Sequence, residues 1–168
     1  MLPRTLKNFN TFVDMHNWAG VAESFTIPKI TKKTDDYRGA GMIGDIALSM
    51  GYEKLEGEVV YAGFDVKQYR QLGVCGTSDL PVRFVGIYER QDNCTSQIVE
   101  IYTRGQAIEL DPGDSKNGEK TEIKMSYNYT YYRLEVDGVV EVELDFINSI
   151  ERFGSTDFAK SIKRMLGL

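Results

Sequence analysis

The stretch "KMSYNYTYYRLEVDGVVEVELDF", residues 124–146, decides the fold because apolar and polar residues alternate on both sides of a central Asp137-Gly138 pair. Asp-Gly is a favoured composition for a two-residue hairpin turn, in which both central residues need positive φ. With the turn placed there, Tyr131 lies opposite Leu144. A slip of one residue would mix the apolar and polar sets, so the sequence predicts this register.

This register divides the hairpin into two faces. The apolar face is expected to pack on the core and consists of Tyr127, Tyr129, Tyr131, Val140, Val142, Leu144 and Phe146. The other face is polar and acidic, and it carries Ser126, Asn128, Thr130, Tyr132, Glu141, Glu143 and Asp145. Such alternation is typical of an antiparallel sheet with one solvated face.

Strand-like runs recur along the chain and are separated by turn-rich segments, so the sequence predicts a mainly β fold. These runs are residues 8–14, 18–27, 53–64, 82–90, 97–109, 121–136 and 139–147. Two short helices are expected. One covers 65–72 and ends at Gly73, and the other covers 155–166, with a cap at Ser155 or Thr156 and a stop at Gly167.

Two segments cannot continue a strand. "DPGDSKNGEK", residues 111–120, combines a proline, two glycines and several charges, which predicts a solvent-exposed loop. "KITKKTDDYRGAGMIG", residues 29–44, is longer, polar and glycine-rich, and a compact domain rarely carries such a segment without a function or a partner. We interpret it as an extended arm of a single domain that spans 1–168.

Composition limits the classes of function. Twenty Lys and Arg against twenty-five Asp and Glu give a net charge of −5, which opposes nonspecific binding to nucleic acid. Cys75 and Cys94 are too few and too far apart for a metal site and are expected to be reduced thiols. The first ten residues lack the apolar run of a signal peptide, and no stretch approaches the roughly 18 apolar residues of a membrane span. A soluble protein without a membrane anchor is expected.

Catalytic chemistry is not indicated. His16 is the only histidine, and "DMHNWAG" reads as a hairpin loop, so a surface histidine is favoured over a general base. The carboxylates of 141–145 have the spacing of any solvated strand rather than of a metal site. "GAGMIG", residues 39–44, lacks the Gly-Lys-Ser/Thr ending of a phosphate-binding loop. We expect no enzyme and no cofactor.

Four phrases of the sequence are specific enough to suggest a family. They are "MLPRTLKNFN", "AGVAESFTIPKITKKTDDYRGAGM", "ELDPGDSKNGEKTEIKMSYNYTYYRLEVDG" and the closing "LGL". Together they make the chain resemble, from end to end, the major tail tube proteins of contractile-tailed bacteriophages and of R-type bacteriocins. The stretch 66–82 is less distinctive.

The resemblance implies a β-barrel or sandwich with a flanking short helix and extended arm, similar to the tube protein of type VI secretion. Six subunits would form a ring, and rings would stack into a tube inside a contractile sheath. The implied partners are further copies of the chain, the sheath protein, a baseplate or tube initiator, and a tape-measure protein. DNA would pass through the bore without specific binding. The implied location is the virion tail, assembled in the host cytoplasm.

In such a tube we expect the acidic face of the hairpin to line the bore, since a wall of like charge keeps DNA from adhering. The expected lumen residues are Glu141, Glu143, Asp145, Ser126, Asn128 and Thr130. The resemblance also implies that the arm contacts neighbouring subunits, and the residues expected to do so are Lys29, Lys32, Lys33, Tyr37, Arg38, Gly39, Gly41 and Met42.

Other classes of protein remain open from the sequence. A β-sandwich binding module would be a compact monomer with a short ordered 29–44 loop. A hydrolase using the acidic strand would need two carboxylates converging in a pocket with a perturbed pKa. A tube from a headless bacteriocin or a type VI-like system would share the tube fold without carrying DNA.

Overall fold

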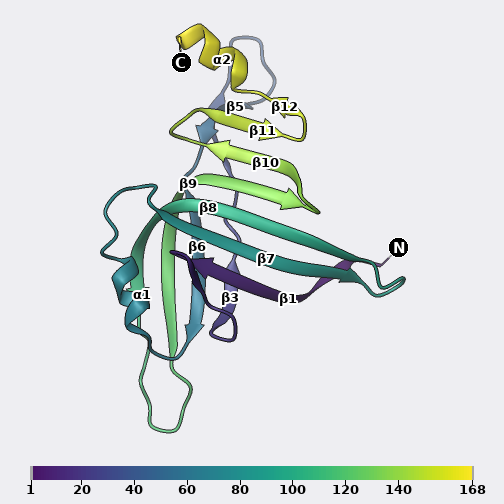
Figure 1. Cartoon of the computed structure of the whole chain (residues 1–168). Coiled ribbons are helices and arrows are strands. Elements are labelled where there is room, and N and C mark those ends of the chain that lie inside the picture. Colours follow the sequence, from purple (N-terminus) through teal and green to yellow (C-terminus); the bar gives the residue numbers. More distant parts are fainter. Residues whose placement is uncertain (1, 168) are drawn as a thin grey trace.

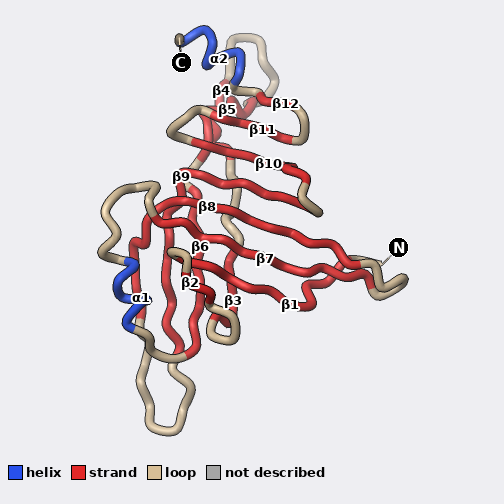
Figure 2. The backbone as a smooth tube through the Cα atoms, viewed as in Figure 1, coloured by secondary structure: helices blue, strands red, loops and turns tan. Residues whose placement is uncertain are grey.

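The computed structural model describes residues 2–167 and consists of two packed β-sheets, two short helices and a projecting two-stranded arm (Figures 1 and 2). The mainly β class predicted from the sequence is confirmed. Two long strands, β8 (Ser96–Asp111) and β9 (Glu122–Val136), run through both sheets. The two sheets therefore form one continuous hydrogen-bonded network.

The larger sheet uses the first part of β8 and the last part of β9. Its strand order is β12-β11-β10-β9-β8-β7-β1-β2. The other members are β1 (Arg4–Val13), β2 (His16–Asn17), β7 (Leu80–Arg90), β10 (Val139–Asp145), β11 (Ile150–Phe153) and β12 (Thr156–Asp157). We call it the large sheet.

The second sheet, called the small sheet, is formed by residues 105–111 of β8, residues 122–129 of β9, β6 (Leu55–Ala62) and β3 (Ala22–Thr26). Its strands run along the long direction of the molecule, whereas those of the large sheet run across it (Figure 1). The strand order is β8-β9-β6-β3, because β9 pairs with both β8 and β6, and β6 also pairs with β3.

The turn from one sheet into the other is made at Gly105 and Thr130. The β8–β9 ladder passes from Arg104↔Tyr131 to Gly105↔Tyr129, which leaves Thr130 as an extra residue in a β-bulge. A Cβ atom on Gly105 would overlap the backbone carbonyl oxygen of Asn128. Only glycine therefore permits this close approach of the two strands.

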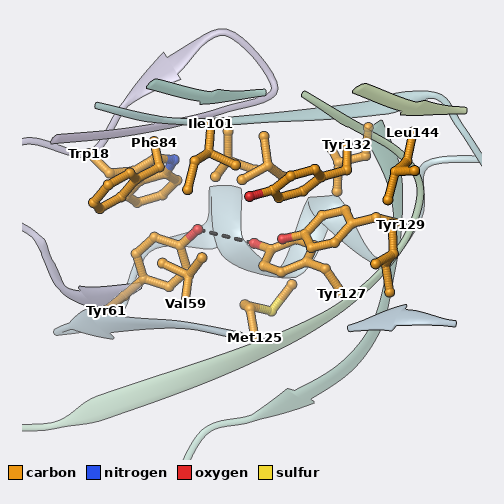
Figure 3. Close-up of a cluster of buried hydrophobic side chains, with 14 residues drawn as sticks. Trp18, Val59, Tyr61, Phe84, Ile101, Met125, Tyr127, Tyr129, Tyr132 and Leu144 are labelled. Atoms are coloured by element: carbon orange, nitrogen blue, oxygen red, sulfur yellow. Dashed lines mark hydrogen bonds between the residues drawn. The ribbon is translucent and has the colours of Figure 1, made fainter. Parts of the chain in front are cut away.

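The core between the sheets is unusually rich in tyrosine (Figure 3). Tyr61 and Tyr127 are fully buried, and their hydroxyl oxygens lie 3.1 Å apart. The Tyr127 hydroxyl donates to Oε1 of Gln71 at 2.5 Å, so that the polar ends of both rings are paired. The other labelled residues of this cluster are Trp18, Val59, Phe84, Ile101, Met125, Tyr129, Tyr132 and Leu144.

Helix α1 (Val66–Gln71) flanks the core and supplies that glutamine. Asp65 caps the helix by accepting from the backbone N–H of Lys67 at 2.9 Å, and Gln68 completes a capping box. Gln68 and Gln71 are buried, which turns the opposite side of the helix to solvent. The helix lies where the sequence predicted it.

The Asp137-Gly138 turn forms as predicted, with φ of 49° and 80° at its two residues. The predicted register holds only next to the turn, where Val139 pairs with Val136. A bulge at Glu141 then shifts the ladder by one, so Leu144 faces Tyr132 instead of Tyr131. The prediction that Tyr131 belongs to the core and Tyr132 to the polar face is therefore wrong.

At the C-terminal end, helix α2 (Lys160–Leu166) is shorter than predicted. Thr156 is in strand β12, and the N-cap position is taken by Ala159, which makes no side-chain cap. The predicted cap at Ser155 or Thr156 is wrong because the chain first completes a small hairpin with β11. The predicted stop at Gly167 is confirmed by its left-handed conformation, with φ of 74°.

Candidate functional site: two outward faces and an arm

The six residues predicted to form one acidic wall are divided by the structure. Ser126 and Asn128 point outward from the small sheet, and Thr130 occupies the bulge at the corner. There its hydroxyl contacts that of Ser78. Glu141, Glu143 and Asp145 belong to β10 of the large sheet. The expectation that these six residues share one continuous face is wrong, because the two bulges turn the strands.

Asp145 is also not exposed. It is 4% accessible, and its carboxylate accepts from the backbone N–H groups of Ile147 and Asn148 at 3.1 and 2.9 Å. The side-chain amide of Asn148 donates to it as well, at 2.7 Å. Asp145 therefore closes the turn that follows β10. The structure gives it a local structural role that the alternating pattern did not reveal.

The outward face of the small sheet, which we call the acidic face, carries a surplus of carboxylates. Ladder partners point to the same side, so Glu58, Ser126 and Glu109 form one row across three strands. The carboxylates of Glu58 and Glu109 form no ion pair or hydrogen bond within residues 2–167. The outward charged residues on these ladders are Glu56, Glu58, Glu109, Asp111 and Glu122 against Lys124.

The outward face of the large sheet, which we call the balanced face, has a different construction. Its ladders align one row of side chains over seven strands, from β1 to β12. In strand order the row is Phe12, Arg83, Tyr102, Arg133, Glu143, Arg152 and Asp157. Cations alternate with aromatic rings and carboxylates, so that attraction runs along the whole row.

Contacts on the balanced face are close. The Arg83 guanidinium donates two hydrogen bonds to Oε2 of Glu100, at 3.1 and 2.6 Å, and lies 5.1 Å from the centre of the Tyr102 ring. The Arg133 guanidinium lies 4.5 Å from the centre of the same ring. Tyr131 donates to Glu143 at 3.0 Å, and Arg152 lies 3.6 Å from the same carboxylate. The opposite charges of these groups therefore largely neutralise each other.

The electrostatics follow from these contacts. The hydrogen bond from Tyr102, together with the neighbouring Arg83, lowers the pKa of the Glu100 carboxyl, although partial burial opposes the shift. Burial and the same hydrogen bond raise the pKa of the Tyr102 hydroxyl. Neither shift produces a general acid or base near neutral pH, and the carboxylate is held ionised. The face is suited to cohesion rather than to proton transfer.

Both lateral edges of the small sheet are open. Strand β3 pairs only with β6, and residues 106–111 of β8 pair only with β9 within the described part of the chain. Open edges offer unpaired backbone N–H and C=O groups to any further strand. The sheet therefore ends in two edges that another copy of the chain could extend.

The segment predicted as an arm folds as a hairpin of β4 (Lys32–Tyr37) and β5 (Ile46–Tyr52), longer than the predicted 29–44 range. Its base is fixed to β11, because the Tyr52 hydroxyl donates to Glu151 at 2.5 Å. Burial, followed by this contact, raises the pKa of Tyr52. Gly41, with φ of 85°, forms part of the tip.

The predicted arm residues lie along this hairpin. Lys32 sits at the base, 3.9 Å from Glu151, and Arg38 lies near the tip, 3.9 Å from Asp45. Gly39 donates its N–H to the sulfur of Met42 across the tip at 3.0 Å. Lys29, Lys33 and Tyr37 are exposed, and their side chains form no ion pair or hydrogen bond within residues 2–167.

No catalytic or metal centre emerges from the geometry of residues 2–167. No group of three or more His, Cys, Asp or Glu side chains in this range could hold a metal ion. His16 is exposed, and its Nδ1 lies 2.8 Å from the carbonyl oxygen of Asp14 in the turn after β1.

Solved structures share this fold. A chain of the anti-feeding prophage cap aligns with a TM-score of 0.61 at 10% identity, over 80% of this chain and 92% of its own. A chain of the sheath-tube complex of the extracellular contractile injection system PVC aligns with a TM-score of 0.59 at 8% identity, over 79% and 91%. The fold is therefore that of proteins that build contractile injection systems.

Sequence comparison narrows the class. The profile of the family described as phage tail tube protein FII matches residues 3–167. The tail tube protein of Escherichia phage P2 is 39% identical over 170 residues, covering 99% of both chains. The major tail tube protein of Serratia phage KSP20 is 35% identical over 170 residues, covering 99% of this chain and 98% of its own. The chain belongs to the phage tail tube protein family.

Membership confirms the family expected from the sequence and places the chain in the virion tail as a structural protein rather than an enzyme. No helix among residues 2–167 is long and apolar enough to span a membrane. In the related contractile systems, solved assemblies include a sheath-tube complex, a baseplate and a tube-terminating cap.

Two features of the structure were not predicted from the sequence: the grouping of carboxylates on the acidic face, and strand β5 of the arm. Carboxylates of the acidic face come from β6, β8 and β9, and only their register brings them together. The β5 strand had a usable signal, because Ile46, Leu48 and Met50 alternate with smaller residues. The neighbouring glycines directed the interpretation toward a loop.

Proposed function

We propose that the chain forms the inner tail tube as stacked rings of six subunits, with a bore through which DNA passes. The observation that carries this proposal is the small sheet, which combines two open edges with an acidic outward face. A closed ring uses up both edges of every subunit, because the β3 edge of one copy can pair with the β8 edge of the next.

The acidic face is assigned to the bore in this proposal. Ser126 and Asn128 keep their predicted lumen role, beside Glu58 and Glu109. Glu56 and Glu122 pair with Lys54 and Lys120, but the carboxylates of Glu58 and Glu109 have no cationic partner within residues 2–167. A wall with such a surplus of carboxylates repels the DNA backbone, which carries one charge per about 1.7 Å of duplex. Glu143 and Asp145 leave the lumen set because their charges are used within the subunit.

The balanced face, which lies on the other side of the sandwich, would then form the outer surface of the tube. The sheath protein is the partner expected to surround it. The arm joins subunits in the direction along which rings stack, and head-to-tail contacts of this kind do not close. Tube length must therefore be limited by another molecule, which is the role proposed for a tape-measure protein, while a baseplate starts the polymer.

Electron microscopy of the purified protein at increasing concentration tests the assembly. Rings with six subunits and stacks of such rings are expected, with β3 and β8 of neighbours adjacent in the reconstruction. A persistent monomer at all concentrations, both alone and with a purified baseplate, would contradict the tube. A reconstruction with Glu58 and Glu109 on the outer circumference would contradict the lumen assignment.

Charge reversal tests the bore separately. Glu58→Lys combined with Glu109→Lys should leave the tube intact and make it retain DNA, measured by co-sedimentation of short duplexes with tubes at low and high salt. The retained DNA should fall steeply as salt rises. Lys116→Glu, in the exposed loop, serves as a control that should not change retention, because Lys116 pairs only with the neighbouring Glu119 among the described residues.

A further inference from the structure

The arm and helix α1 carry two exposed patches of matching character. On the arm, Tyr37 pairs with Ile46 and Asp35 pairs with Leu48, so these four side chains share one face of the hairpin. Tyr37, Ile46 and Leu48 remain 52%, 47% and 43% exposed. The carboxylate of Asp35 forms no ion pair or hydrogen bond within residues 2–167. We call these four residues the arm patch.

The second patch lies on the outward side of α1. Val66, Tyr69 and Arg70 are spaced i, i+3 and i+4 and share one helix face, opposite the buried Gln68 and Gln71. The preceding Phe64 contacts Tyr69, with ring centroids 5.3 Å apart. Phe64, Val66, Tyr69 and Arg70 make up the α1 patch.

The α1 patch is apolar with one free cation. Phe64, Val66 and Tyr69 are 67%, 50% and 40% exposed. Arg70 forms no ion pair within the described residues. Clustered apolar side chains of this size on a soluble protein mark an interaction site. Arg70 on α1 and Asp35 on the arm carry opposite charges, and each is surrounded by exposed apolar side chains.

The two patches cannot meet within one subunit. The arm projects at the end of the molecule that carries α2, whereas α1 lies toward the other end, beside the small sheet (Figure 1). The strands of the small sheet run between these ends. If these strands follow the tube axis, stacking would bring the arm end of one ring against the α1 end of the next.

We propose that the arm patch of one subunit docks on the α1 patch of a second copy in the adjacent ring, with Asp35 paired to Arg70. This inference rests on the tube function proposed above and names the contact that stacks the rings. The contact joins two different surfaces of the same chain, so it repeats head to tail without closing. Burial of the facing apolar side chains stabilises it, and the ion pair fixes its register.

Charge exchange tests the pairing. Asp35→Arg and Arg70→Glu should each raise the protein concentration needed for half-maximal polymerisation about tenfold, because like charges then face each other. The double variant should return to within about twofold of the parent chain, since the exchanged pair attracts again. Polymer is measured by sedimentation and electron microscopy, and folding of each variant by circular dichroism.

Asp36 provides a matched control. It is exposed on the same strand but pairs with Ala47, so it points to the opposite face of the arm. Asp36→Arg should therefore polymerise within about twofold of the parent. Single variants that polymerise like the parent, or a double variant no better than either single, would overturn the docking while leaving the tube intact. A parent chain that forms no tubes, either alone or with a purified baseplate, would overturn the tube function as well.

Cross-linking gives an independent measurement. With the exposed Cys75 and Cys94 changed to serine, Leu48→Cys and Val66→Cys in one chain should form disulfides between subunits in oxidised tubes. Ser49→Cys with Val66→Cys should not, because Ser49 faces away from the arm patch. Cross-links in the Ser49 pair equal to those in the Leu48 pair would contradict the proposed orientation.

Discussion

The acidic face and the balanced face share the two long strands β8 and β9, yet their charges are arranged in opposite ways. On the balanced face, Glu100 receives two hydrogen bonds from Arg83 and one from Tyr102. On the acidic face, the carboxylates of Glu58 and Glu109 form no ion pair within residues 2–167. The charges of the balanced face are therefore neutralised within the subunit, whereas the acidic face keeps a surplus of negative charge.

This difference shows why charge content alone does not locate a functional surface. Both faces contain several carboxylates, and a count would not separate them. Paired charges largely cancel at a distance, whereas unpaired ones add to the field outside the protein. The face with unused carboxylates is therefore the one that can repel DNA.

The largest expected effect comes from the corner that creates the two faces. Gly105→Val should destabilise the fold by roughly 3 kcal/mol or more, because its side chain would have to displace the backbone of β9. Urea unfolding followed by circular dichroism measures the change. Gly44→Ala is the control, since a Cβ there meets no atom within 4 Å and the stability should change by less than about 1 kcal/mol.

The buried tyrosines between the two sheets predict that the fold loses stability at alkaline pH, with both sheets unfolding together. Burial raises the pKa of Tyr61 and of Tyr132 to about 12, from the usual tyrosine value of 10.0. A raised folded-state pKa contributes stability that is complete below pH 10 and is lost as the pH rises toward 12. Far-UV circular dichroism and tyrosinate absorbance should therefore change together in this window. Ionisation of all ten tyrosines below pH 11 without unfolding would contradict it.

The comparison also shows what the sequence could and could not predict. The Asp137-Gly138 turn, the mainly β class and α1 followed from local rules, because turn chemistry, alternation and capping are encoded in neighbouring residues. The register beyond the turn did not, since the bulges at Thr130 and Glu141 depend on packing at the sheet corner. Gly105 within a long strand was the available signal of a bend.

The candidate surfaces were predictable to a lesser degree. Ser126 and Asn128 were placed on an outward polar face by alternation alone. Grouping them with Asp145 failed because alternation is lost at each bulge, and two bulges separate these residues. The partners of a charge across neighbouring strands follow only from the register. The sequence therefore could not distinguish the balanced face from the acidic one.

Removing one cation from each face should reduce the folding stability by different amounts. Arg83→Ala removes a two-bond ion pair to Glu100 and packing against Phe12 and Tyr102, and should cost about 1–2 kcal/mol. Lys124→Ala on the acidic face should change stability by less than about 0.5 kcal/mol. Chemical denaturation of both variants measures this, and equal losses would show that the two faces do not differ in cohesion.

The smallest expected effect is on the free energy of unfolding at acid pH, and it arises from Glu100 on the balanced face. The hydrogen bond from Tyr102 and the ion pair with Arg83 lower the pKa of Glu100 below the usual glutamate value of 4.5. A lowered folded-state pKa contributes stability that is present above pH 4.5 and is lost as the pH falls through the folded-state value. Glu100→Gln should therefore be less stable than the parent at pH 7, with the gap narrowing as the pH falls below 4.5. Tyr102→Phe removes the largest cause of the shift, so it should reproduce part of this convergence. A constant gap between parent and Glu100→Gln from pH 7 to pH 3 would mean that the carboxylate's charge contributes nothing to the balanced face.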